Sequence, residues 1–138
     1  MAYWLFKSEP ATWSWADQVA AGAAGTSWNG VRNHLAKKHL QAMAVGEQGF
    51  FYHSNEGKAV VGIVAVIRPY YPDDTDPTAR FGMVDLKAAA ALPRPVTLDA
   101  IKAEPRLSAM VLVNNSRLSV QPVTNEEWTL VCAMGGLA

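Results

Sequence analysis

The chain has 138 residues, of which 50% are hydrophobic and 17% are charged, a balance typical of a folded globular domain rather than a disordered segment. Basic and acidic residues number 12 each, so no overall positive charge attracts nucleic acid, and any such site must be a local patch. The single cysteine, Cys132, excludes an internal disulfide and favours a reducing, cytoplasmic setting, and no apolar run approaches the roughly 18–20 residues of a membrane helix.

The predicted elements begin with a short aromatic strand over residues 3–6 (YWLF), which the following Ser-Glu-Pro ends. Residues 12–25 open with capping residues and become rich in alanine, which predicts a short helix closing at a glycine. After a turn at Trp28, residues 31–43 are predicted to form a second helix. Its core-facing residues are expected to be Val31, Leu35 and Met43.

A β-hairpin is the clearest local pattern in the chain. Residues 49–53 (GFFYH) and 59–67 (AVVGIVAVI) are strand-like and flank the turn sequence SNEGK. Because the second strand is almost entirely apolar, we expect it to lie in the centre of a sheet. Pro69 and Pro72 are expected to end it.

The middle of the chain predicts a loop, a strand and a helix. Residues 73–80 are polar and predict a loop, and residues 80–88 predict a strand, followed by a linking stretch rich in alanine and proline. Residues 95–105 predict a helix of one or two turns, with Thr97 as the N-cap and Pro105 as the stop.

The last elements complete an α+β pattern. Residues 117–123 alternate and predict a strand, and residues 124–136 predict a helix because Thr124 and Glu127 form a capping box. Neither a repeat nor a linker divides the chain, so we expect one domain. Short strands with small helices between them suggest a small, partly open barrel with helices at its ends.

Metal and nucleophile chemistry find little support. Of the three histidines, His34 and His39 lie five residues apart on one predicted helix, where they point about 140° apart. Zinc pairs on helices need a spacing of three or four residues. We therefore predict neither a metal nor a cofactor, and interpret Cys132 as a small buried apolar residue.

Aromatic and short polar residues gather where strands and turns meet. Lys7 and Ser8 follow the first strand, Trp28 and Asn29 form a turn, and Ser54 and Asn55 occupy the hairpin. Such a group can bind a planar base by stacking and by reading its edge. Composition alone leaves open that Trp28 simply fills the end of the barrel. The nearby basic residues form either a phosphate-binding patch or an ordinary solvated face. They are Arg32, Lys37 and Lys38.

Five separated motifs, in matching order, resemble the EVE domain of the PUA-like superfamily. They are YWLFKSEP (3–10), WNGVRN (28–33), GFFYHSNEG (49–57), VVGIVAV (60–66) and RLSVQPVT followed by EEW within 117–128. The resemblance covers essentially the whole chain. It implies a single EVE domain over residues 1–138, with an α+β fold: a PUA-like small mixed β-barrel of about five or six strands flanked by short helices. Related YTH and SRA domains read methylated bases, which implies a modified-base reader.

Residue by residue, the resemblance implies a base pocket and a set of backbone contacts. The pocket residues are Lys7, Ser8, Trp28, Asn29, Ser54, Asn55 and Phe81. The expected phosphate contacts are Arg32, Lys37, Lys38 and Arg117. The family usually has aspartate in place of Asn29 and often tryptophan in place of Phe81. The amide can donate as well as accept, so the preferred base can differ from that of other members.

Three functions follow as hypotheses. The first is a non-catalytic module that binds a modified nucleobase, such as a methylated or hydroxymethylated cytosine or a methylated adenine, in DNA or RNA. The second is an ASCH-like hydrolase that uses Lys7 and Glu9 on a modified base or nucleoside. The third is a protein-interaction domain with a vestigial pocket. We expect a monomer without a membrane partner, cytoplasmic or nucleoid-associated, and a partner of DNA-modification or restriction systems.

Overall fold

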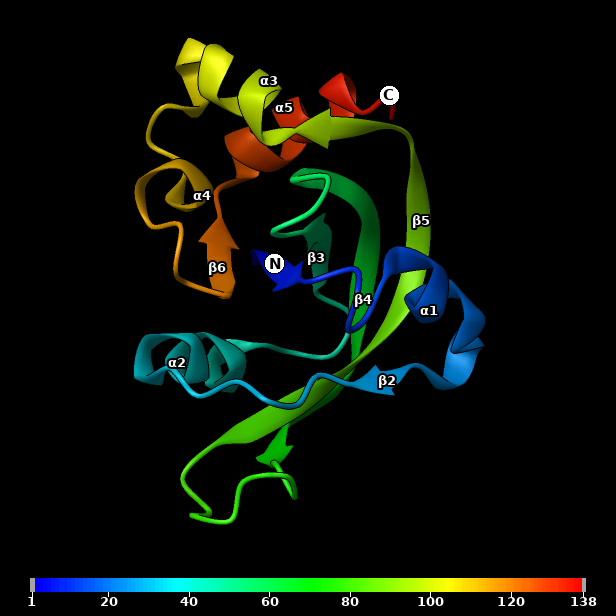
Figure 1. Ribbon diagram of the computed structural model, residues 1–138, viewed down its shortest axis with the longest axis vertical. Helices are drawn as coiled ribbons and strands as arrows, with labels where there is room; N and C mark the ends of the chain where they lie inside the picture. Colours follow the sequence, from blue (N-terminus) through cyan, green and yellow to red (C-terminus); the bar gives the residue numbers. More distant parts are fainter. Residues whose placement is uncertain (1, 138) are drawn as a thin grey trace.

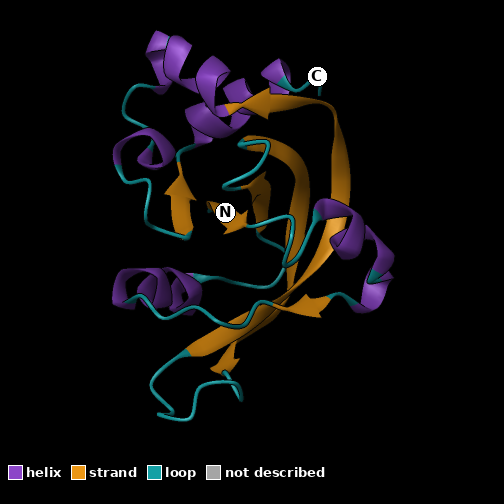
Figure 2. Cartoon of the chain, viewed as in Figure 1, coloured by secondary structure: helices purple, strands orange, loops and turns teal. Residues whose placement is uncertain are grey.

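The computed structural model describes residues 2–137, which form a strongly curved six-stranded sheet with short helices on both faces (Figures 1 and 2). The strands are β1 (Tyr3–Ser8), β2 (Thr26–Ser27), β3 (Gln48–His53), β4 (Ala59–Pro72), β5 (Gly82–Thr97) and β6 (Val120–Val123). The α-helices are α1 (Trp15–Ala20), α2 (His34–Ala42), α3 (Leu98–Ala103), α4 (Val111–Asn114) and α5 (Asn125–Met134), with 3-10 turns η1 (Gly22–Ala24) and η2 (Pro105–Leu107). The predicted α+β class, with a small mixed sheet and short helices, is confirmed.

The sheet order brings distant segments to one edge. The strands follow the order β2-β5-β4-β3-β1-β6, and β1 pairs with β3 in parallel while every other pairing is antiparallel. Parallel pairing places Ser8 opposite His53, so the carboxyl ends of both strands lie side by side. The loop after β1 and the β3–β4 hairpin turn therefore meet at the same edge of the sheet.

Alternating side chains divide the core between the two faces of the sheet. Trp4 and Phe6 belong to one cluster together with Leu40 of α2, whereas Leu5 belongs to the other, with Ile101 of α3 and residues of α5. The five named side chains are nearly or fully buried. Each such side chain contributes roughly 1.5–3 kcal/mol of burial free energy, so both helical layers hold the curved sheet in place.

Helix α2 is shorter than the helix predicted for its segment. The Asn33 side chain caps its N-terminus by accepting a backbone N–H at 2.9 Å, so the helix starts three residues later than expected. Val31 and Met43 are buried as predicted, but both flank the helix. The prediction for Leu35 was wrong. Leu35 is 47% exposed, because Ala36 and Leu40 form the inner face of the helix and Leu35 points about 100° away from Ala36.

The two longest strands run well past their predicted ends. β4 continues to Pro72 and β5 to Thr97, and their pairing shifts register at several points. Pro69 lies within one of these shifts, between Arg68 and Tyr71, where its missing N–H interrupts no regular ladder. Strand β2 and the short helical turns η2 and α4 were not predicted. Within the described residues, no helix is long and apolar enough to cross a membrane.

Candidate functional site

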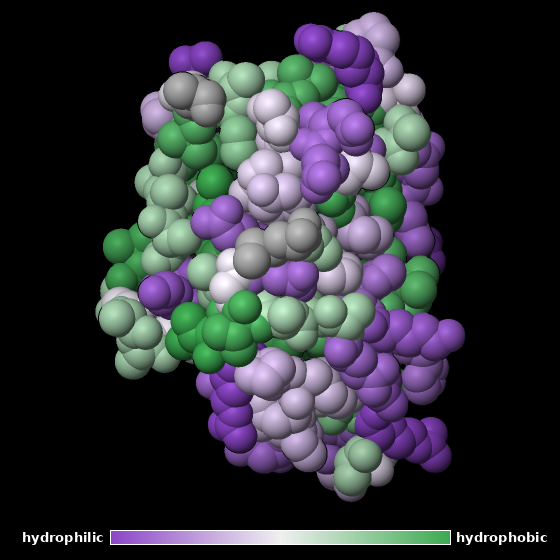
Figure 3. All heavy atoms as spheres, turned by 180° about the vertical axis from the view of Figure 1, so that it is seen from behind, coloured by the Kyte–Doolittle hydropathy of each residue, from purple (hydrophilic) through white to green (hydrophobic). Residues whose placement is uncertain are grey.

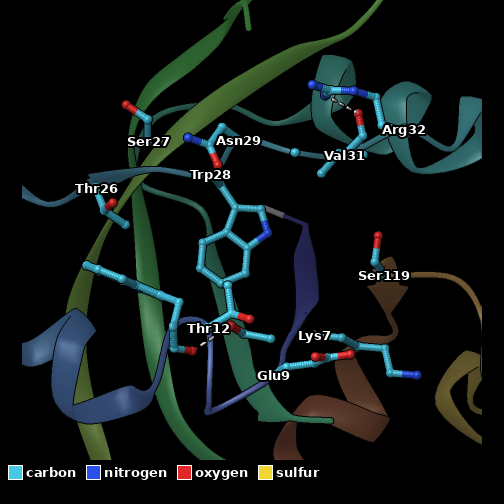
Figure 4. A pocket seen from close by; sticks show the side chains of 13 residues that line it. Lys7, Glu9, Thr12, Thr26, Ser27, Trp28, Asn29, Val31, Arg32 and Ser119 are labelled. Atoms are coloured by element: carbon cyan, nitrogen blue, oxygen red, sulfur yellow. Dashed lines mark hydrogen bonds between the residues drawn. The ribbon is translucent and has the colours of Figure 1, made fainter. Parts of the chain in front are cut away.

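A cavity of about 560 Å³ opens beside Trp28, at the edge of the sheet where β1 ends (Figure 4). We call it the Trp28 cavity. It is lined by residues 7–9, 12, 13, 26–32 and 119. These positions come from the end of β1, the loop after it, β2, the loop leading to α2, and the residue just before β6. The volume lies within the range of roughly 300–1,000 Å³ usual for small-ligand sites.

Trp28 forms part of both the cavity wall and the core. Its backbone N–H donates to the Val84 carbonyl of β5 at 2.8 Å. Its indole packs edge-on against Phe6 and Phe51, at centroid distances of 5.5 and 5.7 Å, and the residue is 8% exposed. Among residues 2–137 the sole fully buried side-chain polar atom without a partner is an oxygen of Gln121. The Trp28 N–H has no partner in that part of the chain, so it reaches accessible space.

Asn29 lies above the indole in Figure 4, and the next residue, Gly30, also lines the cavity; we call these two residues the rim. Asn29 is exposed, and its side-chain amide has no hydrogen-bond partner within the described chain. Gly30 has φ +81°, a left-handed conformation that favours glycine, and its N–H donates to Asp73 Oδ2 at 2.9 Å. The rim therefore offers a free amide on a fixed backbone.

Trp13 is a second tryptophan on the cavity wall, and the sequence reasoning missed it. It lies just before the N-cap Ser14, outside helix α1, and is partly exposed. Its indole N–H donates to Gln18 Oε1 at 2.9 Å, and fully buried Gln18 donates in turn to the Leu86 carbonyl at 3.0 Å. The sequence TWSW carries no local signal that separates Trp13, at the cavity, from Trp15 of α1, which packs edge-on against Phe51.

Lys7 stands between the Trp28 cavity and a second hollow. Its amine donates to the Ser116 carbonyl and lies 5.7 Å from the centre of the Tyr52 ring, and burial lowers the pKa of the amine. Within residues 2–137 it forms no ion pair with Glu9, although both line the two hollows. The neighbouring Ser8 hydroxyl donates to the Trp13 carbonyl at 2.6 Å.

The second hollow, of about 490 Å³, is named here the Arg117 cavity. Lys7, Glu9 and Ser119 line both hollows and separate them. The remaining lining includes three further hydroxyl or amide side chains and two exposed cations. These are Ser54, Asn55, Ser116, Lys58 and Arg117. Neither Lys58 nor Arg117 has an ion-pair partner among the described residues.

The predicted site residues therefore fall into three groups. Lys7, Ser8, Trp28, Asn29 and Arg32 line the Trp28 cavity, whereas Ser54, Asn55 and Arg117 line the second hollow. Phe81, Lys37 and Lys38 line neither.

Phe81 instead contacts basic groups near the start of α2. Its ring centre lies 5.0 Å from that of His34, 5.7 Å from Lys37 Nζ and 5.9 Å from the Arg32 guanidinium carbon. The structure thus brings Trp13, not Phe81, to the cavity that Trp28 lines.

Reactive groups are sparse outside these hollows. Among residues 2–137 no cluster of three histidine, cysteine, aspartate or glutamate side chains could hold a metal ion. Burial raises the pKa of the Cys132 thiol, which disfavours the nucleophilic thiolate. The arrangement is suited to binding a planar polar ligand between aromatic and amide groups.

Comparison with known proteins relates this chain to one family by two separate matches. Residues 2–134 match the family model of the EVE domain. Human thymocyte nuclear protein 1 is 32% identical over an alignment that is 165 residues long, gaps included, and that covers 96% of this chain and 73% of that protein.

Several solved structures share the fold. A protein of Rhodopseudomonas palustris is 62% identical with a TM-score of 0.94, over 99% of this chain and 94% of that one. The human THYN1 protein, solved in complex with DNA containing 5-methylcytosine, is 31% identical with a TM-score of 0.93, over 100% and 99% of the two chains. The YTH domain of the Zygosaccharomyces rouxii MRB1 protein, solved with N6-methyladenosine RNA, shares the fold at 16% identity and a TM-score of 0.59. The chain belongs to the EVE domain family.

Proposed function

We propose that this protein is a non-catalytic reader that binds a modified nucleobase of a nucleic acid in the Trp28 cavity. The observation that carries the proposal is the cavity itself, where an indole wall meets an unpaired amide on a fixed rim. The likeness to the human THYN1 protein in complex with DNA containing 5-methylcytosine supports a methylated cytosine as the first ligand to test.

The chemistry of the cavity suits a flipped or unpaired base. Trp28 and Trp13 supply aromatic walls, and stacking on such a wall contributes about 1–3 kcal/mol per base. Asn29 and the indole N–H of Trp28 are free to bond the edge of the base. A methyl group adds about 0.8 kcal/mol of apolar burial, so selectivity also requires walls that exclude water from its place.

The Arg117 cavity is proposed to hold the neighbouring phosphate and sugar of the same strand. Three cations line it, Lys7, Lys58 and Arg117, against a single acid, Glu9. Hydroxyl and amide groups complete the lining, and burial raises the pKa of the Tyr52 hydroxyl, which stays protonated as a donor. The base would then lie in the Trp28 cavity and its flanking phosphate in the Arg117 cavity, with Lys7 between them.

An ASCH-like hydrolase is the competing function, and the geometry favours it less. The Lys7 amine is held by the Ser116 carbonyl and has no ion pair with Glu9 within the described residues, so the pair is not arranged for proton transfer. Incubation with modified nucleosides, followed by mass spectrometry, tests for turnover. A product that disappears in Lys7→Ala would establish catalysis and overturn a purely binding role.

Binding of short oligonucleotides that differ in one base tests the proposal directly. The panel compares cytosine with 5-methylcytosine and 5-hydroxymethylcytosine, and adenine with N6-methyladenine, each in DNA and in RNA. The affinity for each oligonucleotide is measured by fluorescence anisotropy at low and moderate salt. We expect one modified base to bind about five-fold or more tightly than its plain counterpart, the equivalent of one good polar or stacking contact. Equal binding across the panel would leave a protein-interaction domain as the better description.

Arg117→Ala is expected to weaken binding of modified and plain strands to the same extent. The exposed guanidinium lines the second hollow, away from Trp28, and a phosphate contact carries no base information. The slope of log affinity against log salt should fall by about one, because one fewer counterion is released. Arg106→Ala is the matched control, since Arg106 is already paired with Glu104 and lines neither hollow. A change confined to modified strands would place Arg117 at the base instead.

A further inference from the structure

We infer that Asp73 positions the rim of the Trp28 cavity: from the β4–β5 loop it fixes the Asn29–Gly30 peptide and holds Arg32 away from the phosphate backbone. This inference rests on the proposed function and adds a specificity-determining residue that lines neither hollow. The β4–β5 loop, residues 73–81, occupies the lower end of the molecule, where Figure 3 shows strongly hydrophilic side chains gathered.

One buried carboxylate joins this loop to Gly30 of the rim and to Arg32. The Asp73 side chain has no exposed surface. Its Oδ2 accepts from the Gly30 N–H at 2.9 Å and from Arg32 Nη1 at 3.1 Å, and its Oδ1 accepts from the Thr75 N–H and hydroxyl at 2.8 and 2.6 Å. These four hydrogen bonds hold the carboxylate in one orientation and link the β4–β5 loop to the rim.

The bond to Gly30 controls the residue that faces the ligand. The Gly30 N–H belongs to the peptide that joins it to Asn29, so fixing this N–H fixes the plane of that peptide. The Asn29 side-chain amide has no hydrogen-bond partner within residues 2–137, and its direction therefore depends on the backbone that carries it. Gly30 has φ +81°, and residues 28–33 connect β2 to α2 without a turn or bend, contrary to the turn predicted at Trp28, so the Asp73 bond holds this connecting segment in place.

The bond to Arg32 changes what this arginine can do. Its guanidinium donates to Asp73, to the Thr75 hydroxyl at 3.1 Å and to its neighbour's carbonyl at Val31, also at 3.1 Å. In Figure 4 its side chain turns away from the indole. The negative charge of Asp73 offsets the positive charge of Arg32, so the rim attracts phosphate only weakly. Contacts to the base then account for a larger share of the binding free energy.

Asp76 is a matched control within the same loop. It is 7% exposed and also accepts four hydrogen bonds, but all come from Thr78, Arg80 and Phe81 of its own loop. Burial by itself raises the pKa of Asp73, but the hydrogen bonds from Thr75, Gly30 and Arg32 outweigh burial, so the pKa is lowered overall. The pKa of Asp76 is also lowered, mainly by the hydrogen bonds from Thr78. Both carboxylates are charged at neutral pH, so Asp73→Asn and Asp76→Asn each remove one buried charge.

Affinities of the 138-residue chain for matched plain and 5-methylcytosine oligonucleotides, measured at two salt concentrations, test this inference. We expect Asp73→Asn to lose about five-fold or more of the preference for the modified strand, because an amide has one acceptor oxygen and cannot accept from both the Gly30 N–H and the Thr75 N–H. Plain-strand affinity should stay equal or rise, since Arg32 is released. Asp76→Asn should keep the preference, and hydrogen exchange at Gly30 should speed up only in the Asp73 variant.

Several outcomes would overturn the inference. A folded Asp73→Asn variant with unchanged preference would remove Asp73 from specificity while leaving the reader function intact. Equal loss in both aspartate variants would point to loop integrity alone. If no base in the panel is preferred by the wild type, the proposed function fails and the inference with it. Should Asp73→Asn not fold, Thr75→Val loosens the same carboxylate and Arg32 without removing the charge, and unchanged preference in that variant contradicts the role.

Discussion

Trp28→Ala is expected to abolish the preference for a modified base and to destabilise the fold by about 3–5 kcal/mol, the usual cost of removing a large core aromatic. The second effect follows from the position of the indole, which packs against Phe6 and Phe51 as well as lining the cavity. The free energy of unfolding, measured by urea denaturation, gives the stability term, and anisotropy with paired oligonucleotides gives the preference.

Trp28→Phe separates the two effects. A phenylalanine ring keeps much of the packing against Phe6 and Phe51 but loses the indole N–H and part of the stacking face. We expect a folded protein whose affinity for the modified strand falls by a factor of about 5 to 150, the equivalent of a lost stack of 1–3 kcal/mol. Trp4→Phe is the control, because Trp4 belongs to the same core cluster but its N–H bonds Glu47, away from both hollows. A folded Trp28→Phe with wild-type preference would contradict the proposed base site.

Local patterns were sufficient to predict much of the fold. The hairpin follows from two apolar runs around SNEGK, and the last helix follows from the capping box of Thr124 and Glu127, which the structure contains. These features depend on residues a few positions apart. The long continuations of β4 and β5 depend instead on each other, because register shifts between them accommodate prolines that normally end a strand.

The candidate site was harder to predict for the same physical reason. Residues next to a predicted strand end, such as Lys7 and Ser8, could be placed at the cavity from local pattern alone. Phe81 and Trp13 could not, because their positions depend on loop hydrogen bonds. The Phe81 N–H donates to Asp76, which directs the ring toward Lys37, while buried Gln18 holds Trp13 at the cavity. Hydrophobic periodicity carries no information on such contacts.

Trp13→Ala is expected to reduce the preference for a modified base about as strongly as Trp28→Phe, although Trp13 is partly exposed whereas Trp28 is buried. Its ring supplies the second aromatic wall of the Trp28 cavity, so its loss removes stacking worth about 1–3 kcal/mol. The substitution also leaves Gln18 Oε1 buried without its donor, which costs about 1–3 kcal/mol of stability. Anisotropy with the paired oligonucleotides and urea denaturation measure the two effects separately.

Two control variants assign any loss to the ring. Gln18→Met breaks the same hydrogen bond but keeps the indole ring, so stability should fall while the preference for the modified base falls less than in Trp13→Ala. Phe81→Ala removes the aromatic ring that lies among His34, Lys37 and Arg32, outside the Trp28 cavity, and is expected to affect plain and modified strands equally. Loss of preference in Phe81→Ala with retention in Trp13→Ala would reverse this assignment and make Phe81 the second wall.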